Sequence, residues 1–316
     1  MSNDADMQTL AEVCRYQSAK RPDAIAMVFE GRATSFRELD RLSNKTANAL
    51  IAERLSPQTR IAVLDKNSDS YFEILFGAAK SNNVLVAINW RLAPPEVSYI
   101  INDSMAEVLF VGEEFFPAVE KILGELKTVK KIIALNGSHA DWEGYLHWRD
   151  RQADADPYIS SDTSDVTVQM YTSGTTGHPK GAQLTNGSLL NVVDVITIEF
   201  TKWEPSDVSL VCMPLFHIGG TGYALMGFYS GCKNVILRET IPSDILQAIS
   251  EHRVTKAFLV PALLLFLLQT PGVEETDCSS LDLIIYGASP IPLDLLRRAM
   301  ETFRCGFAQT YGLTET

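Results

Sequence analysis

The most informative segment of the sequence runs from residue 170 to residue 181 and reads Met170-Tyr171-Thr172-Ser173-Gly174-Thr175-Thr176-Gly177-His178-Pro179-Lys180-Gly181. Its last ten residues contain four hydroxyl side chains, three glycines and one lysine. Glycine lets backbone amides approach oxygen atoms closely, hydroxyl groups add hydrogen bonds, and lysine places a positive charge beside a phosphate. This composition predicts a loop that wraps a polyphosphate.

The segments on either side of this loop favour the same interpretation. The apolar run 166–170 predicts a strand, and a helical pattern begins near Thr185, so we expect a strand, a loop and a helix in that order. The loop is not of the Walker A type, because Gly177 is followed by His178 and Pro179 rather than by lysine and a hydroxyl residue. Taken alone, a flexible surface loop rich in glycine and threonine is the alternative.

Three further segments follow the loop along the chain. They read Pro214-Leu215-Phe216-His217-Ile218-Gly219-Gly220, Tyr286-Gly287-Ala288-Ser289-Pro290 and Thr310-Tyr311-Gly312-Leu313-Thr314-Glu315-Thr316. With the loop, they resemble the signature motifs of the adenylate-forming (ANL) superfamily, which comprises acyl-CoA synthetases, luciferases and the adenylation domains of peptide synthetases. The resemblance extends over the whole chain and is to the N-terminal part of such an enzyme.

Outside the motifs, strand-like and helix-like patterns alternate, which predicts an α/β fold of layered sheets covered by helices. We expect strands at 25–29, 60–64, 84–88, 108–111, 131–135, 166–170, 208–212, 235–237, 254–260 and 281–286. We expect helices at 7–20, 35–53, 68–80, 95–101, 116–126, 189–198, 243–252 and 292–303, and one that ends at 229. Ser243 is the expected N-cap of its helix.

The resemblance also implies a domain organisation. Members of the superfamily are considerably longer than 316 residues, so we expect residues 1–316 to be a truncated AMP-binding domain that lacks the mobile C-terminal domain. Within it we expect two subregions, at about 1–150 and 166–316, joined by a polar connector at 151–165. The connector is rich in aspartate and serine, which indicates a solvated loop rather than a metal site.

Composition narrows the classes of function. The chain has 316 residues, of which 46% are hydrophobic, and this is enough for a substantial core. A net charge of −12 disfavours non-specific binding to nucleic acid or anionic membranes. The five cysteines are widely spaced without a metal-ligand pattern, and we expect reduced thiols.

The sequence shows no secretory signal, and its longest apolar run, 257–268, is too short to span a bilayer. We therefore expect a cytoplasmic protein without a transmembrane segment. Peripheral membrane association through an apolar substrate stays open, as does a homodimer.

The resemblance implies a nucleotide-binding role for most motif residues. The loop would hold the β- and γ-phosphates of ATP through Thr172, Ser173, Gly174, Thr175, Thr176, Gly177 and Lys180. The adenine side of the site would be formed by Gly287, Ala288, Ser289, Tyr311 and Gly312, with Tyr311 stacking on the base. Thr314 would donate to the α-phosphate, and Glu315 would hold Mg²⁺, which proteins usually bind through one or two carboxylates and phosphate oxygens.

The acid pocket is implied to lie beside His217. We expect Thr172, Lys180, His217 and Glu315 to be the catalytic residues. Gly219, Gly220 and Gly222 are expected to leave room for a bulky acyl or aryl group. No aspartate lies between Phe216 and Phe228, which disfavours an amino-acid substrate, because its buried ammonium would be left unpaired. For His217 a structural role is the alternative, and for 286–290 an ordinary strand-to-helix turn.

The implied reaction is attack of a small-molecule carboxylate on the α-phosphorus of ATP, giving an acyl-adenylate and pyrophosphate, followed by transfer to coenzyme A. Both reactants are anions, so positioning and charge neutralisation would supply most of the acceleration. We expect a fatty-acid or related acyl-CoA ligase, an acid–thiol ligase that forms AMP.

Two alternatives stay open. One is an adenylate-forming ligase that delivers the acyl group to a carrier protein, or a ligase of the oxygenase type. The other is a nucleotide-binding module without catalysis. The ribose-binding acid, hinge and adenylation lysine of the superfamily have no counterpart in 1–316, so we expect this chain by itself to be largely or wholly inactive. The acyl chain length and the choice between aliphatic and aromatic acids are left open.

Overall fold

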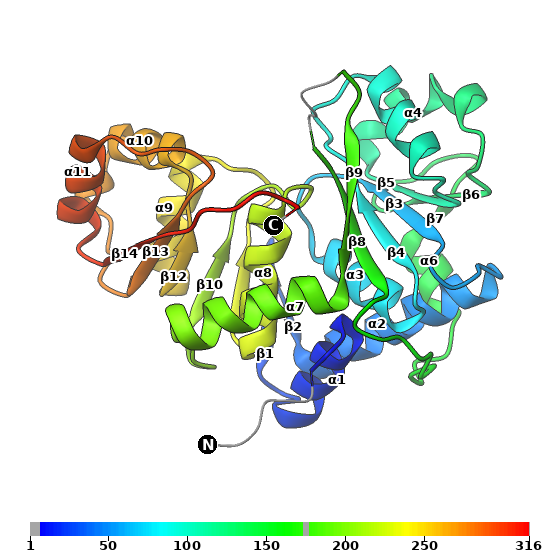
Figure 1. The fold of residues 1–316 in the computed structure, drawn as a ribbon, viewed down its shortest axis with the longest axis horizontal. Coiled ribbons are helices and arrows are strands. Elements are labelled where there is room, and N and C mark those ends of the chain that lie inside the picture. Colours follow the sequence, from blue (N-terminus) through cyan, green and yellow to red (C-terminus); the bar gives the residue numbers. More distant parts are fainter. Residues whose placement is uncertain (1–6, 173–176, 316) are drawn as a thin grey trace. The chain divides into compact units, whose positions relative to one another are not determined.

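Two compact units make up the chain in the computed structural model, which describes residues 7–172 and 177–315. Unit 1 contains Met1–Asp23 and Phe36–Val192, and unit 2 contains Ala24–Ser35 and Val193–Thr316. Each unit is built around a sheet flanked by helices (Figure 1). This confirms the predicted α/β class of layered sheets covered by helices. Residues 151–165 lie within unit 1.

The sheet of unit 1 has seven strands among the described residues. In spatial order they are β7 (Glu143–Gly144), β6 (Lys131–Ala134), β5 (Val108–Val111), β3 (Arg60–Leu64), β4 (Val84–Ala87), β8 (Val166–Thr172) and β9 (Lys180–Thr185). Neighbouring strands are parallel except β8 and β9, which are antiparallel. The central strands β4 and β5 are buried along their whole length, which explains their continuous apolar sequence.

Helices cover both faces of this sheet. They are α1 (Leu10–Lys20), α2 (Phe36–Ala52), α3 (Asp69–Lys80), α4 (Pro94–Asp103), α5 (Phe116–Glu120), α6 (Tyr145–Asp150) and α7 (Asn186–Asp194), with 3₁₀ turns η1 (Glu113–Phe115) and η2 (Leu123–Glu125). α1 begins with a capping box between Thr9 and Glu12, and Ser68 caps α3 by accepting from the backbone of Tyr71. α4 and α5 pack against β3, β4 and β5 through a cluster that includes Val97 and Val119.

Buried charges connect the helices on the other face of the sheet. Lys80 pairs with Asp40 between α3 and α2, and the guanidinium of Arg149 in α6 donates to Glu73 in α3 at 2.5 Å. The hydroxyl of Tyr145 also donates to Glu73, at 2.9 Å. Burial raises the pKa of Glu73, and the charge of Arg149 opposes that shift. The pair therefore stabilises the unit only while both partners are present.

The sheet of unit 2 also has seven strands among the described residues. In spatial order they are β14 (Gly306–Gln309), β13 (Leu283–Tyr286), β12 (Lys256–Phe258), β10 (Val208–Val211), β11 (Lys233–Ile236), β1 (Ile25–Phe29) and β2 (Arg32–Ser35). All neighbours are parallel except β1 and β2, which form a hairpin around Gly31. Residues 25–35 thus enter unit 2 from the beginning of the chain, and Met27 pairs with Asn234.

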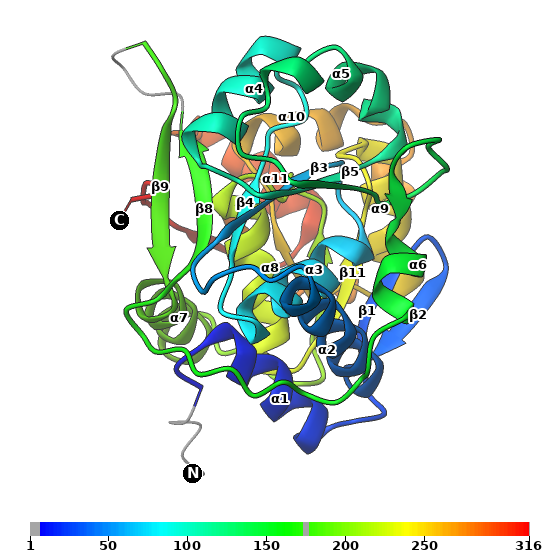
Figure 2. The ribbon, with the colours of Figure 1, turned by 90° about the vertical axis from the view of Figure 1, so that its right-hand side faces the viewer.

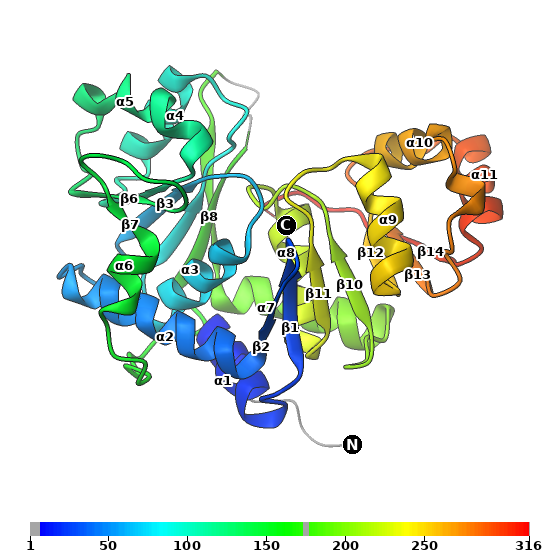
Figure 3. The same cartoon turned by 180° about the vertical axis from the view of Figure 1, so that it is seen from behind.

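The helices of unit 2 lie on both sides of its sheet. They are α8 (Ile218–Ser230), α9 (Pro242–His252), α10 (Pro261–Gln269) and α11 (Leu293–Phe303), with a π-helical turn η3 (Val195–Phe200) and a 3₁₀ turn η4 (Val273–Glu275). α9, α10 and α11 share one apolar cluster with β10, β12 and β13 (Figure 3). α8 packs on β10 and β11, and its C-cap residue is Gly231, which has a φ of 74°.

The largest departure from the sequence prediction follows the glycine-rich loop. A strand, β9, occupies residues 180–185 between the loop and the helix, so the predicted order of strand, loop and helix lacks one strand. α7 begins at Asn186, one residue after the predicted start near Thr185. β8 and β9 form a hairpin (Figure 2). The pairing with β8 explains why a short segment with one buried residue, Leu184, forms a strand.

Smaller departures occur at helix ends. The helix predicted at 116–126 ends at Glu120, before a 3₁₀ turn that contains Gly124, a poor helix former. The prediction that Ser243 caps its helix is wrong, because α9 begins at Pro242, which is favoured in the first turn. The strand predicted at 254–260 is shortened to β12, and Pro261 begins α10.

Candidate functional site

The predicted phosphate loop joins β8 to β9 at the edge of the unit 1 sheet. Thr172 and Lys180 are partners in the register of the two strands, so the two ends of the loop lie side by side. Lys180 is exposed, and Gly177 has a φ of 115°, which glycine adopts without steric cost. Ser173, Gly174, Thr175 and Thr176 lie outside the described residues.

Gly181 lets two side chains of β8 pack closely over the hairpin. A Cβ atom at this position would lie 2.3 Å from Nε2 of Gln169 and 3.0 Å from Cζ of Tyr171. The Tyr171 hydroxyl donates to Oδ2 of Asp103 at 2.6 Å, and burial and this carboxylate raise the pKa of Tyr171 well above its usual value. The Tyr171 hydroxyl therefore keeps its proton and can act as a donor at neutral pH.

The other three motifs share one edge of the unit 2 sheet. The segments 212–217, 287–290 and 310–315 follow the carboxyl ends of β10, β13 and β14, which run in parallel. The chain places β11 on one side of β10 and β12 on the other, so the order of connections reverses beside β10. In open α/β sheets, ligands bind at the carboxyl edge near such a reversal.

His217 stands at the beginning of α8. Its backbone nitrogen donates to the carbonyl of Pro214 at 3.1 Å, and its carbonyl accepts from Gly220 and Thr221. Its ring lies 4.4 Å from that of Phe216, and the residue is exposed. The backbone of His217 therefore serves as a helix cap, while its imidazole lies at the surface of unit 2.

The glycines after His217 are explained by packing. A Cβ at Gly220 would lie 2.1 Å from the carbonyl oxygen of Pro214, and a Cβ at Gly219 would lie 3.0 Å from the ring of Phe258. A Cβ at Gly222 would lie 3.0 Å from Cδ1 of Ile218. A side chain at any of these three positions would meet neighbouring protein atoms, and the expectation that the glycines leave room for an acyl or aryl group stays a prediction.

Two of the nucleotide motifs meet at the ends of β13 and β14. The backbone nitrogen of Thr310 donates to the carbonyl of Tyr286 at 2.8 Å. A Cβ at Gly287 would lie 2.6 Å from the carbonyl oxygen of Thr310, so a side chain at 287 would push the two segments apart. Ala288 has a φ of 68°, an uncommon backbone angle for a residue other than glycine. The structure thus brings Gly287 and Thr310, one residue from each motif, together.

Most of the unit 2 residues predicted to contact the nucleotide are exposed. Tyr311 is 96% exposed, which leaves its ring accessible for stacking. Ala288, Ser289, Gly312 and Glu315 are also exposed, and Thr314 is half-buried. Thr172, Gly177 and Lys180 belong to unit 1, so the predicted site residues are divided between the two units.

Glu315, the predicted metal ligand, suits a divalent cation that takes few of its ligands from the protein. Within residues 7–172 and 177–315, no three side chains of histidine, cysteine, aspartate or glutamate gather where a metal ion could be held. An exposed Glu315 can supply one carboxylate to Mg²⁺, which takes its other ligands from phosphate oxygens and water.

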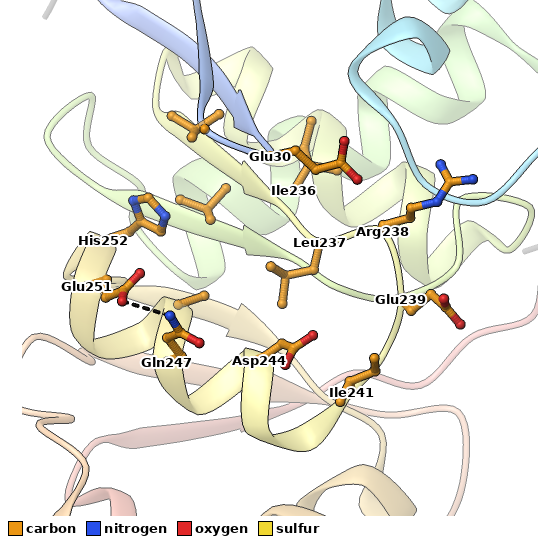
Figure 4. A pocket seen from close by; sticks show the side chains of 14 residues that line it. Glu30, Ile236, Leu237, Arg238, Glu239, Ile241, Asp244, Gln247, Glu251 and His252 are labelled. Atoms are coloured by element: carbon orange, nitrogen blue, oxygen red, sulfur yellow. Dashed lines mark hydrogen bonds between the residues drawn. The ribbon is translucent and has the colours of Figure 1, made fainter. Parts of the chain in front are cut away.

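Unit 2 also contains a pocket of about 350 Å³ that the sequence did not indicate (Figure 4). It lies between α9, the end of β11 and the turn between β1 and β2, and its lining includes the carboxylates of Glu30, Glu239, Asp244 and Glu251. None of the described residues predicted for the site lines it. Its carboxylates disfavour a phosphate ligand. The pocket joins residues about 200 positions apart, which no local pattern could reveal.

A profile of the AMP-binding enzyme family matches residues 14–316. The chain therefore belongs to the AMP-binding enzyme family. It is 39% identical over 314 residues to the fatty acid–[acyl-carrier-protein] ligase ScoC of Streptomyces coeruleorubidus, which covers 98% of this chain and 59% of that protein. It is 34% identical over 297 residues to a feruloyl-CoA synthase of an Amycolatopsis species, with coverage of 93% and 57%.

Solved structures show the same fold. The inhibitor-bound N-terminal domain of FACL13 from Mycobacterium tuberculosis matches with a TM-score of 0.91 at 27% identity, over 98% of this chain and 77% of that one. The chain spans less than two thirds of the length of the two curated relatives. In the part of the chain that the structure describes, no helix has both the length and the apolar character needed to span a bilayer.

Proposed function

We propose that this protein activates a carboxylic acid with ATP, forming an acyl-adenylate and pyrophosphate, and then transfers the acyl group to a thiol. The observation that carries the proposal is the placement of three family motifs after β10, β13 and β14, at the carboxyl edge of one parallel sheet. Membership of the AMP-binding enzyme family supports it.

The proposed roles follow from the chemistry of each side chain. Tyr311 stacks on adenine, and Thr172 and Lys180 donate to the β- and γ-phosphates, so that charge on the leaving pyrophosphate meets fixed donors. His217 borders the reacting carboxylate, and Thr314 donates to the α-phosphate. Glu315 would hold Mg²⁺, which would supply positive charge to the phosphates when bound.

Ser173, Gly174, Thr175, Thr176 and Gly177 complete the proposed phosphate grip, and Gly287, Ala288, Ser289 and Gly312 complete the proposed adenine side. The ring of Tyr311 and the close approach of Gly287 to Thr310 support the adenine side. The carboxylate attacks the α-phosphorus, the bond to pyrophosphate breaks, and the acyl group is left as its adenylate.

Coenzyme A is the acceptor that we propose. The 34% identical feruloyl-CoA synthase supports it, since that enzyme is named for a CoA thioester. A carrier protein is the second candidate, because the 39% identical relative is named as an acyl-carrier-protein ligase. The substrate that we propose is a fatty or related acyl acid.

The test uses the purified natural protein. It is incubated with ATP, Mg²⁺ and a panel of aliphatic and aromatic acids, and pyrophosphate release is measured before either CoA or a loaded carrier protein is added. We expect acid-dependent pyrophosphate release, and then AMP release that depends on one acceptor. Lys180→Ala should raise the KM for ATP about 10- to 100-fold, because a charge-assisted hydrogen bond is lost.

Two outcomes would contradict the proposal. If ATP binds but no acid in the panel releases pyrophosphate, the protein is a nucleotide-binding module without this activity. If Lys180→Ala leaves the KM for ATP unchanged, the loop does not hold the phosphates.

A further inference from the structure

We propose that Tyr99 and Asp103 of α4 are positioning residues that hold the two ends of the phosphate loop in register. The inference rests on the proposed function, because that function makes the phosphates of ATP the ligand of the loop. It concerns the mouth of the loop, which we define as the pair Thr172 and Lys180. Neither residue of α4 belongs to the motifs singled out in the sequence.

The outgoing end of the loop is held by Tyr99. Its ring stacks on that of His178, with centroids 4.9 Å apart and planes inclined by 20°. Its hydroxyl donates to the carbonyl of Pro179 at 3.4 Å. These two contacts act on the residues directly before Lys180. They restrict the position of the Lys180 backbone, and therefore of its side chain.

The incoming end of the loop is held by Asp103, one helical turn beyond Tyr99. Its carboxylate accepts from the hydroxyl of Tyr171 at 2.6 Å, and Tyr171 directly precedes Thr172. The same hydroxyl accepts from Nε2 of Gln169 at 3.2 Å, and Oε1 of Gln169 accepts from Nε of Arg60 at 3.2 Å. The hydroxyl of Tyr171 is therefore held by two partners, Asp103 and Gln169.

The two contacts have a common base. Tyr99 and Asp103 are four residues apart on α4, so they lie on the same face of one helix. α4 is in turn anchored by its buried residues Val97, Ile100 and Ile101 in the apolar cluster of unit 1. One rigid helix thus contacts both ends of the hairpin loop, and donors held in place before the ligand arrives bind it more tightly.

A simpler interpretation is that Tyr99 only packs against the core, since it borders the same apolar cluster. The two interpretations differ in what they expect of His178, which is exposed and can be changed without opening the core. If the stack positions the loop, removing the imidazole matters and another aromatic ring restores the effect. If Tyr99 only packs inward, neither change matters.

The experiment uses the 316-residue chain with His178→Ala, His178→Phe, Asp103→Ala and Asp103→Asn. His147→Ala, which changes another exposed histidine of unit 1, is the matched control. The first measurement is the rate of trypsin cleavage after Lys180, followed by mass spectrometry without nucleotide. The second is the Kd for ATP, measured by calorimetry in the presence of Mg²⁺.

We expect His178→Ala and Asp103→Ala to raise the cleavage rate and the Kd for ATP about 2- to 10-fold each, the range expected for one aromatic stack or one hydrogen bond. His178→Phe and Asp103→Asn should stay near the parent chain, because the ring and the acceptor oxygen are retained. His147→Ala should change neither quantity.

The outcomes separate this inference from the proposed function. If the alanine variants are cleaved at the parental rate, α4 does not hold the loop and the inference is overturned. If cleavage rises but the Kd for ATP does not, the contacts exist but do not position the phosphate donors. If the parent chain does not bind ATP at all, both the proposed nucleotide site and the positioning role are refuted. The rate of trypsin cleavage still decides in that case whether α4 holds the loop.

Discussion

Replacing Gly287 by alanine tests whether the junction of β13 and β14 forms part of the nucleotide site. The added Cβ would lie 2.6 Å from the carbonyl oxygen and 2.8 Å from Oγ1 of Thr310. An ordinary contact begins near 3.4 Å, so Thr310 would have to retreat by roughly 0.8 Å. The hydrogen bond from its backbone nitrogen to Tyr286, now 2.8 Å long, would be lost or strained.

Two separate effects follow from this displacement. Overpacking of this kind costs about 1–3 kcal/mol of folding free energy. Tyr311 moves with Thr310, and loss of its stacking on adenine removes an interaction worth about 1–3 kcal/mol, so the Kd for ATP should rise about 5- to 100-fold. The two effects are of similar size but are measured separately, because the first lowers the Tm and the second raises the Kd for ATP.

The assay is calorimetric titration of the 316-residue chain with ATP and Mg²⁺, alongside thermal unfolding followed by circular dichroism. Gly124→Ala is the matched control, because a Cβ at that position meets no heavy atom within 4 Å. Parental affinity and parental Tm in Gly287→Ala would refute the reasoning. A lowered Tm with parental affinity would show that the junction is structural and lies outside the nucleotide site.

Three further predictions concern single residues. Arg149→Met should cost about 3–5 kcal/mol in urea unfolding, because Glu73 is left buried without its cation. Burial already raises the pKa of Glu73, and removing Arg149 should raise that pKa further. The loss of unfolding free energy should therefore be larger at pH 8 than at pH 5, where more of the carboxyl is protonated, and an equal loss at both pH values would contradict this. Glu73→Gln in the Arg149→Met background should restore part of the stability. Glu315→Gln in the natural protein should raise the Mg²⁺ concentration needed for half-maximal pyrophosphate release, and an unchanged Mg²⁺ titration would exclude Glu315 as the ligand. His217→Ala should raise the KM for the carboxylic acid about 10-fold and leave the KM for ATP within about 2-fold, as expected for a side chain beside the acid; a change in the KM for ATP alone would place His217 elsewhere.

Local patterns predicted most strands, because a buried parallel strand has a continuous apolar sequence. Val108–Val111 and Arg60–Leu64 were predicted with their observed bounds. β9 was missed because its sequence has no strong strand pattern and gains its hydrogen bonds from β8. β2 was missed for the same reason, since it depends on pairing with β1.

The order of the motifs predicted the family and three segments of the candidate site. The order of the motifs could not predict which glycines are needed for packing. At Gly220 a side chain is excluded by backbone atoms of Pro214, which lie close to it only because the chain turns between the two residues. The stack of Tyr99 on His178 joins residues that are far apart in the sequence, and neither residue type indicates the other. Such contacts depend on how helices pack on a sheet, which periodicity does not specify.

The early position of β1 and β2 in the chain affects how the protein is made. Met27 pairs with Asn234, so these strands leave the ribosome roughly 200 residues before the strand beside which they finally lie. At about 5–20 residues per second, that interval lasts about 10–40 s. During this time Ala26, Met27 and Phe29, which are buried in the finished sheet, lack their partner and offer an apolar strand edge. The yield of folded protein in the cell will therefore depend on how well residues 25–35 are protected from aggregation until β11 has been synthesised.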